Sequence, residues 1–466
     1  MDNEKWKDKV LIGLEIHGYI ETEEKLFCRC KNFHDMKKIK PNTNVCPICT
    51  GQPGAKPMLP NKSAIDKIIE IGLILGCKIN SIEENKPLIF QRKHYRWPDM
   101  PYGYQKTISG AHSHHVAENG RFEGIRIREI HLEEDPAACN PETGAIDYNR
   151  AGVPLVEIVT EPDFTNAEDV EDWLRKLVLT LSYIKALNKD AGIKADVNIN
   201  IKGLTERAEI KNVNSASEIV KAIHAEVSRH IKEKPIKRET RRWNSFKNAT
   251  ELMRSKEEQA DYRFISDPDL PMIPLTKKRI AELQKNIPET PMQKLSAIIS
   301  KHKISPDDAK VLTKNLEIVE FFEEIAEKIP PKFALPWITI EWLSVLNYNK
   351  KTMDEVSVDP KHFIELLDLL RKEVITPLKA KEILRKFVPK SFSPGNEAKK
   401  SEKIDDEKEL QKIILSILDK HKNSAADYKN GEDKAFHFLM GQIMQVTQKR
   451  ADFVIAKKVL EKELKK

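Results

Sequence analysis

Residues 10–17 read VLIGLEIH, and this stretch decides the fold class of the first half of the chain. Its side chains alternate, so that Leu14 and Ile16 face one way while Glu15 and His17 face the other. Such alternation is typical of an antiparallel sheet with one buried face and one polar face. We therefore expect a strand here, with one face in the core and one polar face.

Strands with one polar face are also predicted further along the chain. Three further segments show it, namely IHLEED at 130–135, ADVNINI at 195–201 and AEIKN at 208–212. Their polar positions hold Asp, Asn, Glu and His, which supply the oxygen and nitrogen ligands of divalent ions. Each segment alone is also explained by a strand with one face in solvent. If the strands converge, their carboxylates would repel one another, and a bound cation, most simply Mg²⁺ with a nucleotide, would relieve that repulsion.

Four of the six cysteines are clustered in two close pairs, Cys28 with Cys30 and Cys46 with Cys49. Each pair can give two thiolates to one tetrahedral ion, and the loop between the pairs closes a small knuckle. The alternative is a set of buried structural thiols or disulfides. The spacing favours one structural zinc ion, because four thiolates leave no open position for catalysis.

Length and composition exclude several classes of protein. A chain of 466 residues is too long for one core, so about two to four domains are expected. It is 32% charged with a mean hydropathy of −0.52, and no apolar run approaches the length of a membrane span. The polar start and the clustered thiols favour a reducing cytoplasm without a signal peptide. A net charge of +7 permits a nucleic-acid partner without establishing one.

The predicted secondary structure changes along the chain. Residues 1–290 mix strands, turns and a few helices, and residues 291–390 are helical in pattern. Residues 391–405 are rich in Ser, Pro, Gly and charge and are expected to form a linker, whereas 406–466 form a helical tail. Within the first part, helices are expected over 63–76, over 216–232, and behind a capping box made by Thr165 and Glu168. The fold class is therefore α+β.

Residues 91–105, QRKHYRWPDMPYGYQ, interleave basic and aromatic side chains. Such mixtures suit contacts with phosphate, ribose or bases, but an ordinary Pro-rich loop with packed aromatic rings explains them equally well. The sequence holds no Walker loop, no dinucleotide-binding glycine motif and no Gly-x-Ser-x-Gly elbow.

Taken together, the segments closely resemble the B subunit of the tRNA-dependent amidotransferases, the GatB/GatE family. The matching stretches are IGLEIH at 12–17, KLFCRC at 25–30, PNTNVCPIC at 41–49, GQPGA at 51–55, RKHY at 92–95, HLEED at 131–135, DYNRAGVPLVEIVTEPD at 147–163, EIKNVNS at 209–215, DYR at 261–263, DPDLP at 267–271, DYKNG at 427–431 and FLMGQIM at 438–444. The chain has no room for the large insertion of the E-type relatives, so the B type fits better.

The resemblance implies a fold and a reaction. The first part would be the family's catalytic cradle, a mainly antiparallel sheet with flanking helices. The helical domain and the tail would hold the tRNA. The substrate would be misacylated Glu-tRNA(Gln), Asp-tRNA(Asn) or both. ATP and Mg²⁺ would phosphorylate the side-chain carboxylate, and ammonia from the amidase (A) subunit, in a complex with a small C subunit, would displace the phosphate. Phosphoryl transfer needs positioning and charge neutralisation more than a covalent nucleophile, which agrees with a polar sheet face.

The resemblance, joined to the shared strand faces, also assigns site residues. The expected magnesium ligands are His17, Glu134 and Glu209. The residues expected to line the same catalytic site are Glu15, Glu133, Asp196, Asn198 and Lys211. Those expected to bind ATP, substrate or tRNA are Lys93, Tyr95, Tyr104, Asn212 and Asn214.

The chain departs from the family in the loop over residues 188–195. Lys194 stands where the family usually has arginine, and a lysine contacts phosphate as a point charge without a bidentate fork. A function of a different class is also open: the chain could be a non-catalytic, zinc-containing scaffold that binds tRNA and ties other subunits together. A scaffold would have no reason to keep the carboxylates and imidazole of the polar face together.

Overall fold

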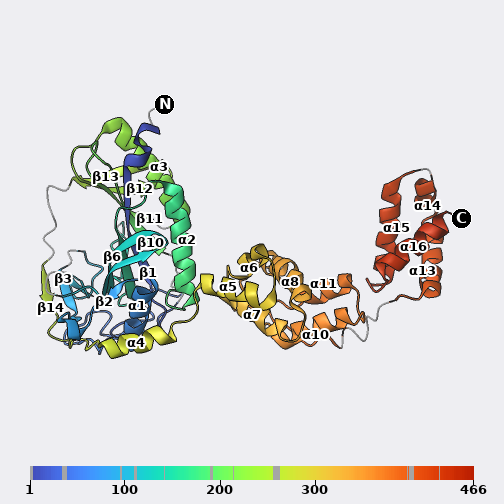
Figure 1. Cartoon of the computed structure of the whole chain (residues 1–466), viewed down its shortest axis with the longest axis horizontal. Coiled ribbons are helices and arrows are strands. Elements are labelled where there is room, and N and C mark those ends of the chain that lie inside the picture. Colours follow the sequence, from blue (N-terminus) through green and yellow to red (C-terminus); the bar gives the residue numbers. More distant parts are fainter. Residues whose placement is uncertain are drawn as a thin grey trace. The chain divides into compact units, whose positions relative to one another are not determined.

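The computed structural model describes residues 4–33, 39–94, 97–109, 113–140, 142–188, 193–213, 215–255, 263–395, 397, 404–429 and 431–465. The chain divides into two compact units, Met1–Thr290 and Pro291–Lys466. The first unit is built on a large sheet with flanking helices and the second is helical, so the α+β class expected from the sequence is confirmed (Figure 1). None of the helices in these described ranges combines the length and the apolar character needed to span a bilayer.

A sheet of twelve strands organises the first unit. Its main path runs β13-β12-β11-β10-β1-β9-β6-β4-β3-β14, and β5 joins β6 and carries β2. Every pairing in it is antiparallel except that of β11 with β12. The strands are β1 (Val10–Tyr19), β2 (Lys78–Ile79), β3 (Gln91–His94), β4 (Tyr104–Thr107), β5 (Ala117–Phe122), β6 (Ile125–Glu134), β9 (Pro154–Thr160), β10 (Ile193–Ile201), β11 (Ala208–Val213), β12 (Glu239–Asn244), β13 (Ala249–Ser255) and β14 (Phe264–Ser266). A separate small hairpin pairs β7 (Ala138–Cys139) with β8 (Ile146–Asp147).

Strand β1 lies inside the sheet, between β10 and β9. Its register places Glu15 opposite Asp196 on one side, and His17 opposite Glu157 on the other. The strands that carry the polar segments of the sequence are therefore neighbours, and β6 follows next to β9.

The apolar face of β1 forms the core of the first unit, with Ile12, Leu14 and Ile16 almost fully buried. They belong to one hydrophobic cluster with the buried apolar side chains of α2 (Ala167–Tyr183), among them Val170, Leu174 and Leu177. Figure 1 shows α2 running beside the sheet, and α3 packs against α2, β10 and β11. The helices of this unit are α1 (Lys62–Ile74), α2 (Ala167–Tyr183), α3 (Ala216–Glu233) and α4 (Lys277–Asn286), with short 3₁₀ turns at Glu4–Lys9 and Ile82–Glu84.

The start of α2 differs from the predicted capping box. The N-cap is Asn166 rather than Thr165, because the Asn166 side-chain oxygen accepts a hydrogen bond from the backbone N–H of Asp169 at 2.8 Å. Asparagine and threonine both cap helices well, so a sequence with the two side by side does not fix which one does.

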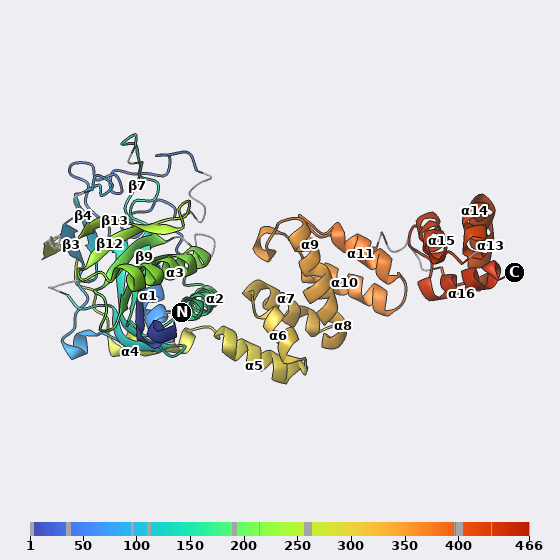
Figure 2. The ribbon, with the colours of Figure 1, turned by 90° about the horizontal axis from the view of Figure 1, so that it is seen from above.

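The second unit contains two separate hydrophobic cores (Figure 2). The first is centred on large aromatic side chains such as Phe322, Trp342 and Phe363. Its elements are α5 (Pro291–His302), α6 (Pro306–Leu312), α7 (Leu316–Ala326), α8 (Pro331–Pro336), a π-helical turn (Trp337–Trp342), α9 (Leu343–Tyr348), a 3₁₀ turn (Met353–Glu355), α10 (Pro360–Arg371) and α11 (Pro377–Arg385). The second core joins α13 (Glu407–Lys420), α14 (Lys422–Lys429), α15 (Asp433–Val446) and α16 (Phe453–Leu464). Much of the expected linker, 396 and 398–403, lies outside the described residues.

Candidate active site

The polar face of the sheet carries a first group of three carboxylates, from Glu15 on β1, Asp196 on β10 and Glu209 on β11. One carboxylate oxygen from each lies within 4.8 Å of the others. The site residues predicted on these three strands are therefore brought together. The group is half-buried to buried, so the mutual repulsion of its charges needs a counter-charge.

Lys211 supplies that counter-charge. Its Nζ lies 2.6 Å from Asp196 Oδ2 and 2.6 Å from Glu209 Oε1. Burial alone would lower the pKa of Lys211, but these two carboxylates raise it well above its ordinary range. Burial, together with the charges of Glu157 and Glu209, raises the pKa of Glu15, and Asn198 Nδ2 donates to Glu15 Oε1 at 3.0 Å. Lys211 and Asn198 thus lie in the first group, beside Glu209 and Glu15.

A second group lies on the other side of β1 and consists of His17, Glu133 and Glu157. His17 Nε2 and Glu157 Oε1 are 3.9 Å apart, and one ligand atom from each of the three residues lies within 4.8 Å of the others. Two carboxylates and an imidazole are a donor set that suits a divalent cation.

Each carboxylate of the second group is held in place by hydrogen bonds. Gln105 Nε2 and Thr107 Oγ1 both donate to Glu133, each at 3.1 Å. Glu157 Oε2 lies 2.9 Å from His131 Nδ1. Burial alone would raise the pKa of Glu157, but its hydrogen bond with His131 lowers it to about 2. Such outer partners orient ligands before an ion binds, so the second group fits a Mg²⁺ site.

Glu134, expected as a magnesium ligand, points to the opposite face of the sheet. Its Oε1 accepts hydrogen bonds from the backbone N–H of Lys106 at 2.9 Å and from Lys106 Nζ at 3.1 Å. Successive side chains of a strand face opposite ways, so only Glu133 can share a face with Glu157. The structure therefore divides the expected ligands: His17 lies in the second group, Glu209 in the first, and Glu134 in neither.

The residues expected to bind ATP, substrate or tRNA are also divided. Lys93 pairs in register with Gln105. Burial raises the pKa of Glu157, while His131, His17 and, last, the charge of Lys93 lower it. Tyr104 lies instead on the other face, where its ring packs on the guanidinium of Arg92 at 4.5 Å. Tyr95 and Asn214 lie outside the described residues, and of Asn212 only the backbone, in β11, is described.

The four clustered cysteines come together as predicted. Their sulfur atoms lie within 4.8 Å of one another, with Cys49 Sγ 3.8 Å from Cys46 Sγ and 4.0 Å from Cys30 Sγ. Zn–S bonds of about 2.3 Å in a tetrahedron put sulfur atoms about 3.8 Å apart. All four are free thiols, and these separations are too long for disulfides. The residues therefore fit one tetrahedral zinc ion.

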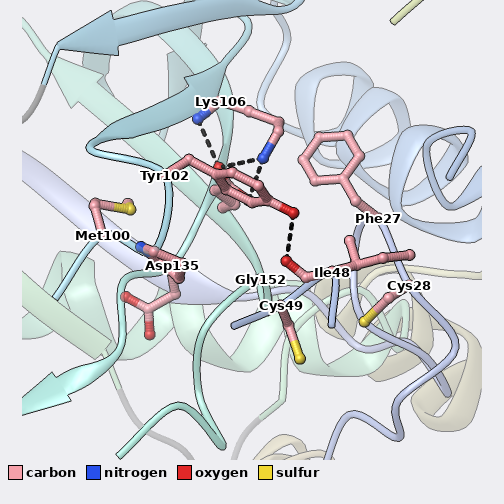
Figure 3. A pocket seen from close by; sticks show the side chains of 11 residues that line it. Phe27, Cys28, Ile48, Cys49, Met100, Tyr102, Lys106, Asp135 and Gly152 are labelled. Atoms are coloured by element: carbon pink, nitrogen blue, oxygen red, sulfur yellow. Dashed lines mark hydrogen bonds and ion pairs between the residues drawn. The ribbon is translucent and has the colours of Figure 1, made fainter. Parts of the chain in front are cut away.

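The cysteine knuckle is tied to the sheet through Tyr102 (Figure 3). The Tyr102 hydroxyl donates to the backbone oxygen of Ile48, between Cys46 and Cys49. On its other side the ring covers Lys106 Nζ at 4.2 Å, and this lysine is only 1% exposed. A cavity of about 10 Å³ remains between these side chains, too small for a substrate. Because β4 also carries Gln105 and Thr107, the knuckle supports the strand that orients Glu133.

Sequence reasoning missed Glu157, Gln105, Thr107 and Lys106. A signal for Glu157 was present, because it is the one charged residue in the otherwise apolar strand PLVEIVT of β9. A lone carboxylate in such a strand indicates a partner or a ligand. No comparable pattern marked the other three, whose roles depend on the pairing of β4 with β6.

Comparisons with known proteins give a consistent result. Residues 10–281 match the GatB/GatE catalytic domain, and residues 320–464 match the GatB domain. The chain is 38% identical over 465 residues to the B subunit of the aspartyl/glutamyl-tRNA(Asn/Gln) amidotransferase of Methanopyrus kandleri, covering 98% of each chain. It is 40% identical over 446 residues to the protein of the same name from Methanothermobacter thermautotrophicus, covering 94% of this chain and 97% of that one.

Proposed function

Since the chain belongs to the GatB/GatE family, of the B type, we propose that it is the subunit of a tRNA-dependent amidotransferase that converts misacylated Glu-tRNA(Gln), Asp-tRNA(Asn) or both. The observation that carries the proposal is the grouping of His17, Glu133 and Glu157, each carboxylate fixed by its own hydrogen bonds. An amidase (A) subunit and a small C subunit would complete the enzyme and supply ammonia.

The reaction has two steps. An oxygen of the substrate's side-chain carboxylate attacks the γ-phosphorus of ATP, the bond from that phosphorus to the bridging oxygen breaks, and ADP leaves. Ammonia then attacks the carbonyl carbon of the acyl phosphate, inorganic phosphate leaves, and the surplus proton passes to a neighbouring base. Both steps concentrate negative charge, so positioned cations and donors are the catalytic machinery required.

The two groups of polar residues would have different roles in this reaction. His17, Glu133 and Glu157 would hold Mg²⁺, which when bound neutralises phosphate charge. Lys93, whose charge acts on Glu157, would contact a phosphate or the tRNA. Lys211, fixed between Asp196 and Glu209, would keep one positive charge in the first group, and Glu15 with Asn198 would line it.

The proposal is tested by Glu157→Gln in the complete complex, with release of phosphate from ATP measured in the presence of misacylated tRNA. We expect a fall of ~10²-fold or more, the scale of losing one electrostatic stabiliser. The control is Glu161→Gln, just after β9, because Glu161 pairs with Arg128 at 2.9 Å and belongs to no ligand group among the described residues. Wild-type turnover in the Glu157 variant would refute the assignment, and reduced tRNA affinity with normal turnover would favour the scaffold function.

A further inference from the structure

A third group of possible ligands lies beside the second, and only His131 among its residues enters the function proposed above, as the hydrogen-bond partner of Glu157. It consists of His115, just before β5, and of Glu129 and His131 on β6. His115 Nε2 is 3.0 Å from Glu129 Oε2, and His131 Nε2 is 3.5 Å from Glu129 Oε1. Both imidazoles thus direct the same ring nitrogen toward one carboxylate.

The two rings are stacked, with centroids 4.8 Å apart and planes inclined by 18°. Stacking places the two Nε2 atoms on the same side of the ring pair, next to Glu129. His131 is held firmly in β6 and is 8% exposed, whereas the half-buried His115 lies in the connection that precedes β5. For both lone pairs to meet at one ion, the His115 ring would have to move toward His131.

The surroundings of His131 are those of a metal ligand. Its Nδ1 contacts Glu157 Oε2 at 2.9 Å, while its Nε2 is buried and makes no hydrogen bond within the described part of the chain. A ligating histidine usually donates one ring N–H to a carboxylate and presents the other nitrogen to the ion. Glu157 here would be that carboxylate.

We propose that His115, Glu129 and His131 form a binding site for a divalent transition-metal ion of the Zn²⁺ class, separate from both the magnesium group and the four cysteines. Two imidazoles and one carboxylate favour such an ion over Mg²⁺, which prefers oxygen ligands. Ligands about 2.0 Å from a tetrahedral ion lie about 3.3 Å from one another. The two imidazoles lie at 3.0 Å and 3.5 Å from different oxygens of Glu129, and one ligand atom from each residue lies within 4.8 Å of the others.

The site would act on the magnesium group through Glu157. The two oxygens of this carboxylate face different groups, Oε1 toward His17 at 3.9 Å and Oε2 toward His131 at 2.9 Å. An ion on His131 Nε2 fixes the imidazole with its proton on Nδ1, which orients Glu157 for the neighbouring cation. In the competing arrangement, His131 stays protonated between Glu129 and Glu157, and no metal binds.

The test is metal stoichiometry on the full-length chain, in buffer with excess Mg²⁺. Wild-type protein titrated with Zn²⁺ should hold two ions, one for the cysteines and one for this group. His115→Gln and Glu129→Gln should each lose one ion or weaken its binding by ~10-fold or more, the scale for losing a ligand or its partner. The matched control is His224→Gln, since His224 forms an exposed pair with Glu168 at 3.1 Å and belongs to no ligand group in the described ranges.

Cobalt identifies which site is lost. Co²⁺ at the four cysteines gives thiolate-to-metal charge-transfer bands, whereas the histidine group gives only weaker visible bands. We expect the His115 and Glu129 variants to lose the weaker bands alone. A single ion in the wild-type chain, or a second ion unaffected by both variants, would overturn the proposal. Neither readout depends on turnover, so the amidotransferase proposal stands or fails independently.

Discussion

Glu133 and Glu134 are consecutive in β6, and their carboxylates bond on opposite faces of the sheet. Glu133 accepts hydrogen bonds from Gln105 and Thr107, while Glu134 pairs with Lys106, which lies between those two residues in β4. Along β4 and β6, successive side chains therefore point to opposite faces of the sheet. One face carries the candidate cation ligands, and the other supports the cysteine knuckle.

The two glutamates should respond differently to loss of charge. Glu133→Gln should reduce ATP-dependent phosphate release by ~10²-fold, because it removes a proposed ligand of the cation. It should cost little stability, because Glu133 lies on the polar face of the sheet and not in the hydrophobic core. Glu134→Gln should destabilise the first unit by about 3 kcal/mol, because it leaves the buried Lys106 without a counter-ion. Urea unfolding and phosphate release distinguish the two effects. If Glu134→Gln abolished phosphate release in a chain as stable as the wild type, Glu134 would be a ligand after all.

The cysteine knuckle should contain zinc that leaves with the loss of one thiolate. Cys49→Ser should lower the zinc bound at the cysteines and the midpoint of thermal unfolding, because the knuckle packs on Tyr102 and through it on β4. Cys139→Ser is the control, since Cys139 lies in β7 outside the group. Elemental analysis of protein purified without chelator measures the metal. Equal zinc in both variants would contradict the assignment.

Acid should destabilise the first unit through Glu226 on α3. Burial alone would raise the pKa of Glu226, but hydrogen bonds with His230 and Arg229 lower it to about 2, from an ordinary value of 4.5. A depressed pKa contributes stability that is complete above about pH 5 and is lost as the pH falls toward 2. Unfolding by urea at pH 7 and at pH 3 should show this loss in the wild type.

Glu226→Gln should be less stable than the wild type at pH 7, and the difference should shrink at pH 3. The control is Glu233→Gln, because Glu233 pairs with the same Arg229 at 3.0 Å but is 56% exposed. An exposed pair contributes little, so this variant should follow the wild type at both pH values. The same pH dependence in all three proteins would exclude Glu226 as the source.

Deleting residues 405–466 should weaken tRNA binding and leave the glutaminase activity of the complex intact. The tail has a hydrophobic core of its own, so its removal should not unfold the sheet. Binding is measured at matched salt, because phosphate contacts depend on ionic strength. Unchanged tRNA affinity of the truncated chain would show that the tail has another role.

Much of the candidate site could be predicted because side-chain alternation depends only on the strand itself. Glu15, Asp196 and Glu209 were predicted on polar faces and meet in one group. Which of two neighbouring acids joins His17 depends on the pairing of β6 with β9, since the register fixes the face. The choice of Glu134 over Glu133 therefore could not be settled by composition, whereas Glu157, the one charged residue of β9, could have been found from the sequence.

The position of β1 inside the sheet affects the order in which the chain can fold during synthesis. Its two neighbours are β9 and β10, and the bond between Glu15 and Asn198 spans 183 residues. During synthesis β1 therefore lacks both of its partner strands until residues 154–201 have been made. Pairings of such long range form slowly, whereas the hydrophobic core of the tail joins side chains from residues 404–464 alone. During synthesis and refolding, the unpaired edges of β1 are therefore the part of the sheet most prone to aggregate, and a chaperone would act there.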